Sequence, residues 1–226
     1  MQRTFVIGDI HGAYEALFQC FERADFDTKK DRLICLGDVC DRRPNVRECI
    51  DELLKIEQLV FIMGNHDKWA LEWMENNNDP SVWLMQGGNL TVKSYRTGVP
   101  EAHRELLRSA LYYYEENNCL YVHGGIDHRL PLNIQHEENF IWDRSLVNTA
   151  LEYTNQNRQL TDYDEIFVGH TPTIRLPEDV FRGNPKNYPL KLCNVWLMDT
   201  GAGWTGGKLS IMDVDSKEVF QSDVLG

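Results

Sequence analysis

The first third of the chain repeats a pattern in which a short apolar run ends at a glycine and a helical segment follows. The three apolar runs fit buried strands, and they lie at residues 4–7, 33–36 and 59–63, ending at Gly8, Gly37 and Gly64. Apolar residues then recur every three or four positions, which predicts helices over 13–24, 44–54 and 69–74. Three strand–glycine–helix units in a row are typical of an α/β fold with parallel strands.

The remainder of the chain is less regular and richer in strands. A polar loop at 76–81 and a turn at Gly87-Gly88 precede a helix that we expect over 101–109. Further strands are expected at 120–122, 166–168, 195–198, 209–212 and 219–220. The last three have connections too short for crossover helices, so we expect them to form an antiparallel meander. The predicted architecture is a single domain over residues 1–226, a two-sheet mixed β-sandwich of the α/β (α+β) class with helices on its outer faces.

Composition and charge exclude several classes of protein. No stretch approaches the ~20 apolar residues of a membrane span, so we expect a cytoplasmic protein without membrane contact. The formal net charge of −12 disfavours a nucleic-acid groove, because such grooves depend on clustered lysine and arginine. Bound divalent cations can invert the polarity of an acidic site, so the charge is compatible with metals. Six cysteines form no C-x-x-C pair, and we expect reduced, mostly buried thiols rather than a zinc site.

Five short segments share one layout, in which an apolar strand is followed by glycine and by side chains of the kind that bind metals. They read GDIHG (8–12), GDVCDR (37–42), GNHD (64–67), HGG (123–125) and GHT (169–171). In open α/β sheets ligands collect beyond the carboxyl ends of the strands, where all five segments are expected. Oxygen from Asp and Asn combined with nitrogen from His suits ions such as manganese, iron or zinc better than calcium.

Each segment alone also has a plainer interpretation. Asp9 could cap a helix beside a surface His11, Gly-Asn-His could be a turn, and His123 could be a satisfied core histidine. The five coincidences in one order favour the metal site over these alternatives. Four of the seven histidines fall in the segments, and the other three are expected at the surface: His103, His128 and His136. Four tryptophans are interpreted as core: Trp69, Trp73, Trp83 and Trp196.

The ordered set GDIHG, GDVCDR, GNHD, HGG and GHT resembles the calcineurin-like metallophosphoesterase superfamily. Within it, the set is similar to the phosphoprotein phosphatase (PPP) branch and, in size, to the bacteriophage lambda type of serine/threonine phosphatase. The motifs run from Asp9 to His170, and the later MDTGAG segment (198–203) resembles the same branch.

The resemblance implies a role for each matching residue. Two divalent ions, most simply Mn²⁺ with Fe, Zn or Ni as alternatives, activate water to hydroxide and clamp the phosphoryl oxygens. Asp38 bridges the ions, and the remaining ligands are divided between them: Asp9 and His11 on one, Asn65, His123 and His170 on the other. His66 is implied as the general acid, and Asp41 orients it and favours its protonated form.

Two arginines are implied as phosphate ligands. Arg42 follows Asp41 directly, and its planar guanidinium suits bidentate contact with phosphate oxygens. Arg144, in the segment Ile-Trp-Asp-Arg, matches a second phosphate-binding arginine of the lambda-type enzymes. Arg43, next to Arg42, is expected to be a solvated surface arginine.

Three residues depart from the family pattern and leave the substrate open. Arg43 stands where the family has glycine, Asp67 where protein phosphatases have Glu, and Met63 where many of them have Arg. An Asp in that motif is familiar from the symmetrical diadenosine tetraphosphatases, which however tend to lack the pair present here as Asp41-Arg42.

The expected function is hydrolysis of phosphomonoesters, as a serine/threonine protein phosphatase of broad specificity acting on a phosphoprotein or a small phosphoester. The alternative is a symmetrical bis(5'-nucleosyl)-tetraphosphatase. A phosphodiesterase or nuclease of the superfamily is disfavoured because the histidine that usually ends G-H-x-H is replaced here by Pro172. A catalytically inactive binding module is disfavoured because the ligands, acid and arginine are all present. The sequence does not indicate an oligomeric state.

Overall fold

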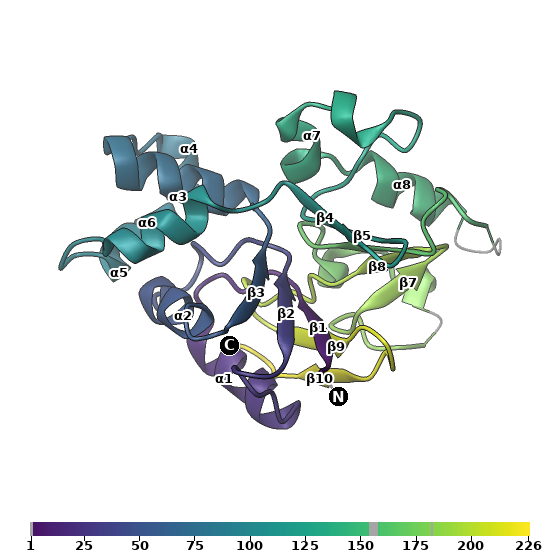
Figure 1. The fold of residues 1–226 in the computed structure, drawn as a ribbon, viewed down its shortest axis with the longest axis horizontal. Helices are drawn as coiled ribbons and strands as arrows, with labels where there is room; N and C mark the ends of the chain where they lie inside the picture. Colours follow the sequence, from purple (N-terminus) through teal and green to yellow (C-terminus); the bar gives the residue numbers. More distant parts are fainter. Residues whose placement is uncertain (1, 154–157, 182) are drawn as a thin grey trace.

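The computed structural model describes residues 2–153, 158–181 and 183–226, and its strands form two five-stranded sheets (Figure 1). The first sheet has the order β10-β9-β1-β2-β3, with strands β1 (Thr4–Ile7), β2 (Arg32–Cys35), β3 (Gln58–Phe61), β9 (Ser210–Asp213) and β10 (Val219–Gln221). The second has the order β4-β5-β6-β8-β7, with strands β4 (Tyr113–Glu116), β5 (Cys119–Val122), β6 (Glu165–Val168), β7 (Leu190–Leu192) and β8 (Val195–Leu197). The predicted two-sheet α/β architecture is confirmed.

Helices lie on the outer faces of the two sheets. Those on the side of the first sheet are α1 (Tyr14–Arg23), α2 (Val46–Leu53), α3 (Asn65–Asn76), α4 (Ser81–Trp83), α5 (Asn89–Ser94) and α6 (Glu101–Arg108) (Figure 1). A π-helical turn, η1 (Leu84–Gly88), joins α4 to α5. On the side of the second sheet lie α7 (Glu137–Trp142) and α8 (Ser145–Glu152), and three short 3-10 turns occur at η2 (Leu132–Ile134), η3 (Thr173–Arg175) and η4 (Glu178–Phe181). No helix in the described residues has the length and apolar character needed to cross a membrane.

Alternation along the strands divides the core into three layers. In β1, Phe5 and Ile7 face the helices, where they pack with the apolar faces of α1 and α2. Val6 points the other way, into a layer between the sheets that includes Tyr121 and Phe167 of the second sheet. A third cluster joins the outer face of the second sheet to α7 and α8. This helix–sheet–sheet–helix stacking explains why the central strands are apolar on both faces.

One local prediction was wrong, and several elements were missed. β8 does not belong to a meander with β9, because it pairs in parallel with β6 in the second sheet, while β9 and β10 form an antiparallel pair in the first. The turn predicted at Gly87-Gly88 is present as a kink inside η1, where Gly87 has a φ of 111°. β4, β7, α7 and α8 were not predicted at all.

The parallel registers bring the carboxyl ends of six strands, three in each sheet, to one edge. Val6 pairs with Ile34 and Ile34 with Val60, so the loops after β1, β2 and β3 begin at the same height along the strand direction. In the second sheet, Val122 pairs with Val168 and Val168 with Leu197, so the loops after β5, β6 and β8 also start level. Side chains in these loops therefore converge although they are up to 190 residues apart in the chain.

Candidate active site

The predicted metal ligands all lie in the loops at this shared edge. Asp9 and His11 follow β1, Asp38 follows β2, and Asn65 begins α3 after β3. His123 and His170 follow β5 and β6 of the second sheet. All six side chains are buried, and five of them are at least 97% buried: Asp9, His11, Asp38, Asn65 and His123. The structure thus brings together every residue of the predicted set.

The loops reach this geometry through unusual backbone conformations. His11, Asp38, Asp41, Arg42 and His170 have positive φ values of 51°, 51°, 73°, 63° and 62°, where non-glycine residues are rare. Conformations of this kind cost of order 1–3 kcal/mol each and cluster at functional sites. Gly64 is needed for close approach, because a Cβ atom there would lie 2.1 Å from Oδ1 of Asp38.

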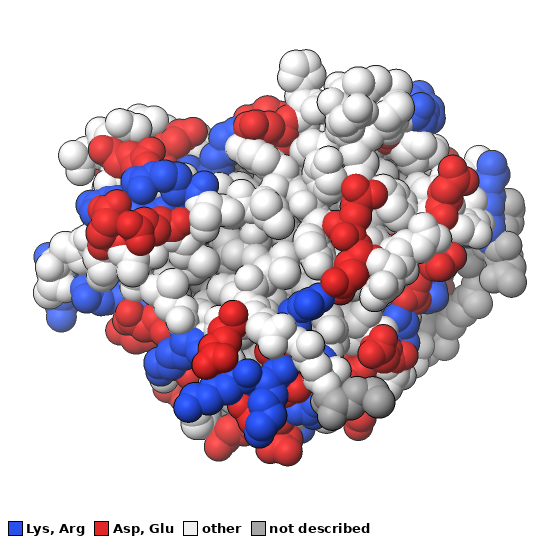
Figure 2. Space-filling view, in the orientation of Figure 1, with Lys and Arg blue, Asp and Glu red and all other residues white. Residues whose placement is uncertain are grey.

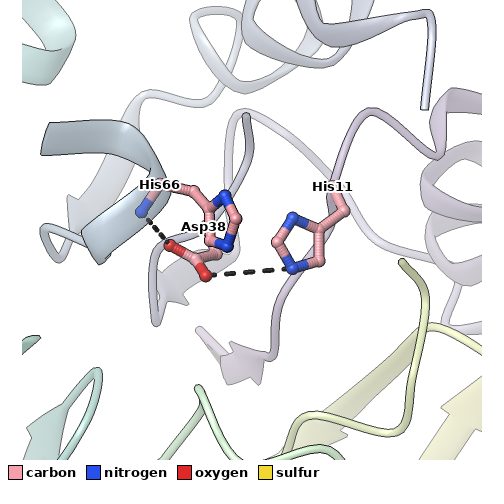
Figure 3. A group of neighbouring side chains, drawn as sticks. All are labelled: His11, Asp38 and His66. Atoms are coloured by element: carbon pink, nitrogen blue, oxygen red, sulfur yellow. Dashed lines mark hydrogen bonds and ion pairs between the residues drawn. The ribbon is translucent and has the colours of Figure 1, made fainter. Parts of the chain in front are cut away.

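Two groups of side chains have the spacing of metal ligands and share Asp38. In the first, ligand atoms of His11, Asp38 and His66 all lie within 4.8 Å of one another, and in the second the same holds for Asp38, His123 and His170. Oδ2 of Asp38 lies 3.8 Å from Nε2 of His11 and 3.4 Å from Nε2 of His123. Figure 3 shows Asp38 between His66, at the start of α3, and His11, in the loop after β1. A carboxylate in this position can bridge two ions.

The remaining ligand-type atoms face the same space. Oδ2 of Asp9 lies 3.9 Å from Nε2 of His11, and Oδ1 of Asn65 lies 3.1 Å from Nε2 of His123. The backbone orients the rings, because Nδ1 of His11 is 2.8 Å from the Cys40 carbonyl oxygen and Nδ1 of His123 is 2.8 Å from that of Leu36. Such bonds fix a histidine so that its other nitrogen can bind a metal.

The electrostatics of the cluster indicate a deficit of positive charge. Burial, together with the charge of Asp199, raises the pKa of Asp9 well above its usual value. Burial also raises the pKa of Asp199 to about 6. Burial acts to lower the pKa of His123, but the charge and hydrogen bond of Asp38 together with the charge of Asp9 outweigh it and raise that pKa to about 9. Crowded buried carboxylates of this kind are stabilised by bound cations.

The donor set fits divalent metal ions. Nε2 of His170 is buried and has no hydrogen-bond partner in the described part of the chain. Burial, with repulsion from His123 and Arg144, lowers the pKa of His170 to about 2, and burial lowers that of His11 to about 3. Both rings are therefore neutral at pH 7 and can donate a lone pair to a metal.

His66 and Asp41 form a buried pair at the edge of the cluster. Nδ1 of His66 lies 2.6 Å from Oδ2 of Asp41, which leaves Nε2 of His66 facing the cavity. The amide of His66 donates to Oδ1 of Asp38 at 2.9 Å, and its ring packs edge-on against Trp69. These contacts fix the position and the rotamer of the histidine.

Asp41 is itself held by two residues that the sequence did not identify as functional. The indole N–H of Trp83 donates to Oδ2 of Asp41 at 2.7 Å, and the Thr91 hydroxyl donates to Oδ1 at 2.6 Å. Trp83 is fully buried, so its interpretation as core is correct but incomplete. Trp83 and Thr91 are eight residues apart in an irregular segment, and this spacing is only a weak indication that they act together.

Arg42 opens onto the same cavity as the metal ligands. Its Nε atom is buried and has no partner among the described residues, and its guanidinium carbon lies 4.4 Å from the centroid of the Trp204 ring. A Cβ atom on Gly87 would lie 2.5 Å from the Arg42 amide nitrogen, so the π-turn packs directly on the Arg42 backbone. Arg144 also lines the cavity, and its Nη2 donates to the His170 carbonyl oxygen at 3.3 Å.

Two expectations about individual residues were wrong. Arg43 is not a solvated arginine, because its Nε donates to the Ala202 carbonyl oxygen at 2.6 Å and ties the MDTGAG segment to the second motif. His103 is 1% exposed rather than at the surface, and its ring bridges the Tyr95 hydroxyl and Asp51. His136 is exposed as expected, whereas His128 is half-buried. Local sequence context did not indicate these tertiary contacts.

The structure adds Asp199 to the site and shows that Asp67 is a structural residue outside the cavity. Asp199, in the MDTGAG segment, lines the cavity with Asp9 and Asp38. Asp67 is fully buried and accepts hydrogen bonds from the amides of Val39 and Cys40 at 3.0 and 3.1 Å. Asp67 therefore stabilises the second motif and does not line the cavity.

The fold and the site define a phosphoester hydrolase with a centre for divalent metals. The chain belongs to the calcineurin-like phosphoesterase family, which matches residues 2–211. Both the predicted family and the predicted enzyme class are confirmed.

The relatives include two kinds of phosphatase. Over 212 residues the chain is 25% identical to serine/threonine-protein phosphatase 1 of Salmonella typhimurium, covering 93% of this chain and 91% of the relative. Over 70 residues it is 37% identical to a symmetrical bis(5'-nucleosyl)-tetraphosphatase of Coxiella burnetii, but this covers only 31% of the chain and 24% of the relative. A crystal structure provisionally assigned as a diadenosine tetraphosphatase matches with a TM-score of 0.68 at 17% identity, over 97% of this chain and 92% of that one, which shows the shared fold.

Proposed function

We propose that the chain is a phosphomonoesterase of broad specificity that removes phosphate from phosphoserine and phosphothreonine in proteins. One observation carries this proposal: the buried His66–Asp41 pair, in contact at 2.6 Å, faces a cavity lined by two metal-type clusters and by Arg42. The pair supplies a proton donor, the clusters supply sites for cations, and the arginine supplies a phosphate ligand. We propose that the catalytic unit extends over residues 1–226 and acts in the cytoplasm.

Two divalent ions are proposed as the cofactor, most simply Mn²⁺, with Fe, Zn or Ni as alternatives. Asp9, His11 and Asp38 would hold one ion, and Asp38, Asn65, His123 and His170 the other. When bound, such ions lower the pKa of water to near neutrality and neutralise charge on the phosphoryl oxygens. His66 also has the spacing of a ligand with His11 and Asp38, so its role requires an experimental test.

His66 is proposed as the general acid. Hydrolysis forms a bond from a water-derived oxygen to phosphorus, breaks the ester bond, and requires a proton on the leaving oxygen. Because Nδ1 of His66 is occupied by Asp41, the proton is delivered from Nε2, which faces the cavity. Asp41 holds the ring in the required orientation and tautomer.

Arg42 and Arg144 are proposed to bind the non-bridging phosphate oxygens. Both line the cavity, and the buried Nε of Arg42 lacks a protein acceptor, which a phosphate oxygen would supply. The stacking of Arg42 on Trp204 restricts the guanidinium before substrate binds, which reduces the entropy lost on binding.

The site geometry favours a monoester over a dinucleotide. The catalytic cavity has a volume of ≈ 60 Å³, which suits a phosphoryl group rather than a nucleotide. Asp67 and Met63, the residues that resemble the tetraphosphatases, do not line this cavity, and Asp67 binds only backbone amides. Their identity therefore supplies little information about the substrate.

The second candidate is a symmetrical bis(5'-nucleosyl)-tetraphosphatase, because a relative with that name matches 70 residues of the chain at 37% identity. A catalytically inactive module is not supported, since every proposed ligand is present and buried. On the face shown in Figure 2, acidic and basic side chains are interspersed.

A comparison of rates tests the assignment. The purified protein with Mn²⁺ is assayed on a phosphoserine peptide, p-nitrophenyl phosphate and diadenosine tetraphosphate under the same conditions. We expect kcat/KM to be higher for the peptide than for the dinucleotide. A preference for the dinucleotide of about tenfold or more, equivalent to about 1.4 kcal/mol, with ADP as the only product, would reverse the assignment.

A further inference from the structure

A second, larger cleft adjoins the catalytic cavity. It has a volume of ≈ 700 Å³ and is lined by three segments, 174–175, 185–187 and 204–206, which include Arg175, Lys186, Asn187 and Trp204. Trp204 lines both this cleft and the catalytic cavity, so the two spaces are neighbours. A cleft of this size accommodates several residues of a peptide, whereas the catalytic cavity does not.

The cleft is positively charged in a chain whose net charge is −12. Arg175 is exposed and Lys186 is half-buried, and neither takes part in an ion pair in the described part of the chain. Among the described residues, no carboxylate lines the cleft. Two unneutralised cations in one cleft repel each other, and an anion bound between them removes this repulsion.

The cleft is connected to the catalytic arginine through one aromatic ring. The guanidinium carbons of Arg42 and Arg175 lie 4.4 and 4.2 Å from the centroid of Trp204. The Asn187 side chain donates to the Gly206 carbonyl oxygen at 3.0 Å, which joins segment 185–187 to segment 204–206, and Gln221 of β10 donates to the Asn187 carbonyl oxygen at 2.6 Å. Arg175, stacked on Trp204, is therefore held at a fixed place relative to the phosphate site.

We propose that this cleft binds acidic side chains that flank the phosphorylated residue of a peptide substrate, with Arg175 and Lys186 as the residues that set the specificity. The proposal rests on the phosphatase function proposed above. The guanidinium carbons of Arg42 and Arg175 lie 4.4 and 4.2 Å from the centroid of one ring, so their separation is within the span of two to three residues of extended chain at about 3.3–3.6 Å each. In a dinucleoside polyphosphate the next phosphate is bonded through one oxygen to the scissile one, so it lies closer to the scissile phosphorus than the side chain of a flanking peptide residue does.

The test uses three phosphoserine peptides that differ only in the flanking residues, which are Glu, Ala or Lys. With wild-type protein and Mn²⁺ we expect kcat/KM to be about threefold to tenfold higher for the Glu peptide than for the Ala peptide, because exposed ion pairs are individually weak. The Lys peptide should be the poorest substrate. The preference should decrease at about 0.5 M NaCl, where charges are screened over about 4 Å.

Variants then assign the preference to the cleft. The double variant Arg175→Gln, Lys186→Gln should reduce the Glu-to-Ala ratio to about one, and Lys186→Glu should favour the Lys peptide. Lys93→Gln, which removes an exposed cation on α5, is the matched control and should keep the wild-type ratio. The rate on p-nitrophenyl phosphate reports the catalytic centre independently of flanking residues.

The outcomes separate this inference from the function on which it rests. If peptides are hydrolysed with no dependence on flanking charge, the cleft proposal is wrong and the phosphatase assignment stands. If only diadenosine tetraphosphate is hydrolysed, both are wrong. A double variant that loses activity on the dinucleotide but retains the Glu preference would assign the cleft to phosphate rather than to a peptide, and would also overturn the proposal.

Discussion

Replacing Trp83 with Phe tests whether catalysis depends on a residue that contacts no substrate. The change keeps an aromatic ring in the core but removes the N–H that donates to Oδ2 of Asp41 at 2.7 Å. Thr91 and His66 would remain as partners of the buried carboxylate. We expect Asp41 to be held less firmly and His66 to spend less time in its catalytic orientation.

The size of the effect follows from the bond that is lost. A hydrogen bond to a buried charged group contributes about 1.5–3 kcal/mol, and Asp41 is 0% exposed. For a chain of this length, about 1 kcal/mol shifts Tm by roughly 2–4 °C, so Trp83→Phe should lower Tm by about 3–12 °C. If the same energy is lost from the orientation of the acid, turnover should fall about tenfold to a hundredfold, since each 1.4 kcal/mol is about a factor of ten.

The assay compares a poor and a good leaving group. Turnover of Trp83→Phe should fall most on a phosphoserine peptide and least on p-nitrophenyl phosphate, because only the poor leaving group requires a proton. Trp73→Phe is the matched control, since Trp73 packs 6.0 Å from Trp83 and makes no hydrogen bond to Asp41. Metal content should be unchanged in both variants.

Two results would refute this reasoning. Equal losses on the two substrates would show that Trp83 does not act through the acid. Equal behaviour of the Trp83 and Trp73 variants would show that only the packing of the aromatic cluster matters.

Four further predictions follow from the site and its surroundings. Asp38→Asn should lower metal content and abolish turnover, as measured by elemental analysis and a phosphatase assay, because Asp38 is shared by both clusters. His66→Asn should bind the same amount of metal but turn over ~10²–10⁴-fold more slowly, with a smaller loss on p-nitrophenyl phosphate; loss of metal would identify His66 as a ligand. Arg42→Ala should reduce kcat/KM by ~10²–10³-fold and weaken inhibition by inorganic phosphate, whereas Arg96→Ala, an exposed control, should not. Burial lowers the pKa of His103 below 6.5. The contribution of the neutral ring to the free energy of unfolding is therefore fully present above pH 6.5 and declines as the pH falls towards the folded-state pKa. Urea titrations should show a smaller decline for His103→Gln.

The elements that the sequence predicted best are those in which local pattern and tertiary environment agree. β1, β2 and β3 are short apolar runs that end at glycine, and in the structure they pair in parallel in this order. Their ligand-bearing loops could be located because the end of a strand is visible in the sequence. The ligand positions then follow from a general rule about the carboxyl ends of parallel strands.

Other elements could not be predicted because their environment is set by distant residues. β4 contains Tyr113 and Glu116, and its polar sequence becomes a strand only by pairing antiparallel with β5. The choice of β6 as the partner of β8 depends on sheet assembly, which strand propensity does not encode. Likewise, the GNHD segment was predicted as a loop, but Asn65 begins α3, and Asp67 in its first turn accepts a hydrogen bond from the Gly64 amide at 3.3 Å.

Net charge was a poor guide to the substrate because the site contains both carboxylates and arginines. The carboxylates of Asp9, Asp38 and Asp199 are buried in the lining of the cavity, where cations can neutralise them, and Arg42 and Arg144, the proposed phosphate ligands, line the same cavity. An approaching phosphoester therefore meets a field set mainly by the nearest charges, because charges more than about 8–10 Å apart are screened in physiological salt. Six aspartates that are buried in the described part of the chain account for half of the net charge of −12, and the half that lies on the outer surface affects encounter rates at low ionic strength much more than affinity in the site.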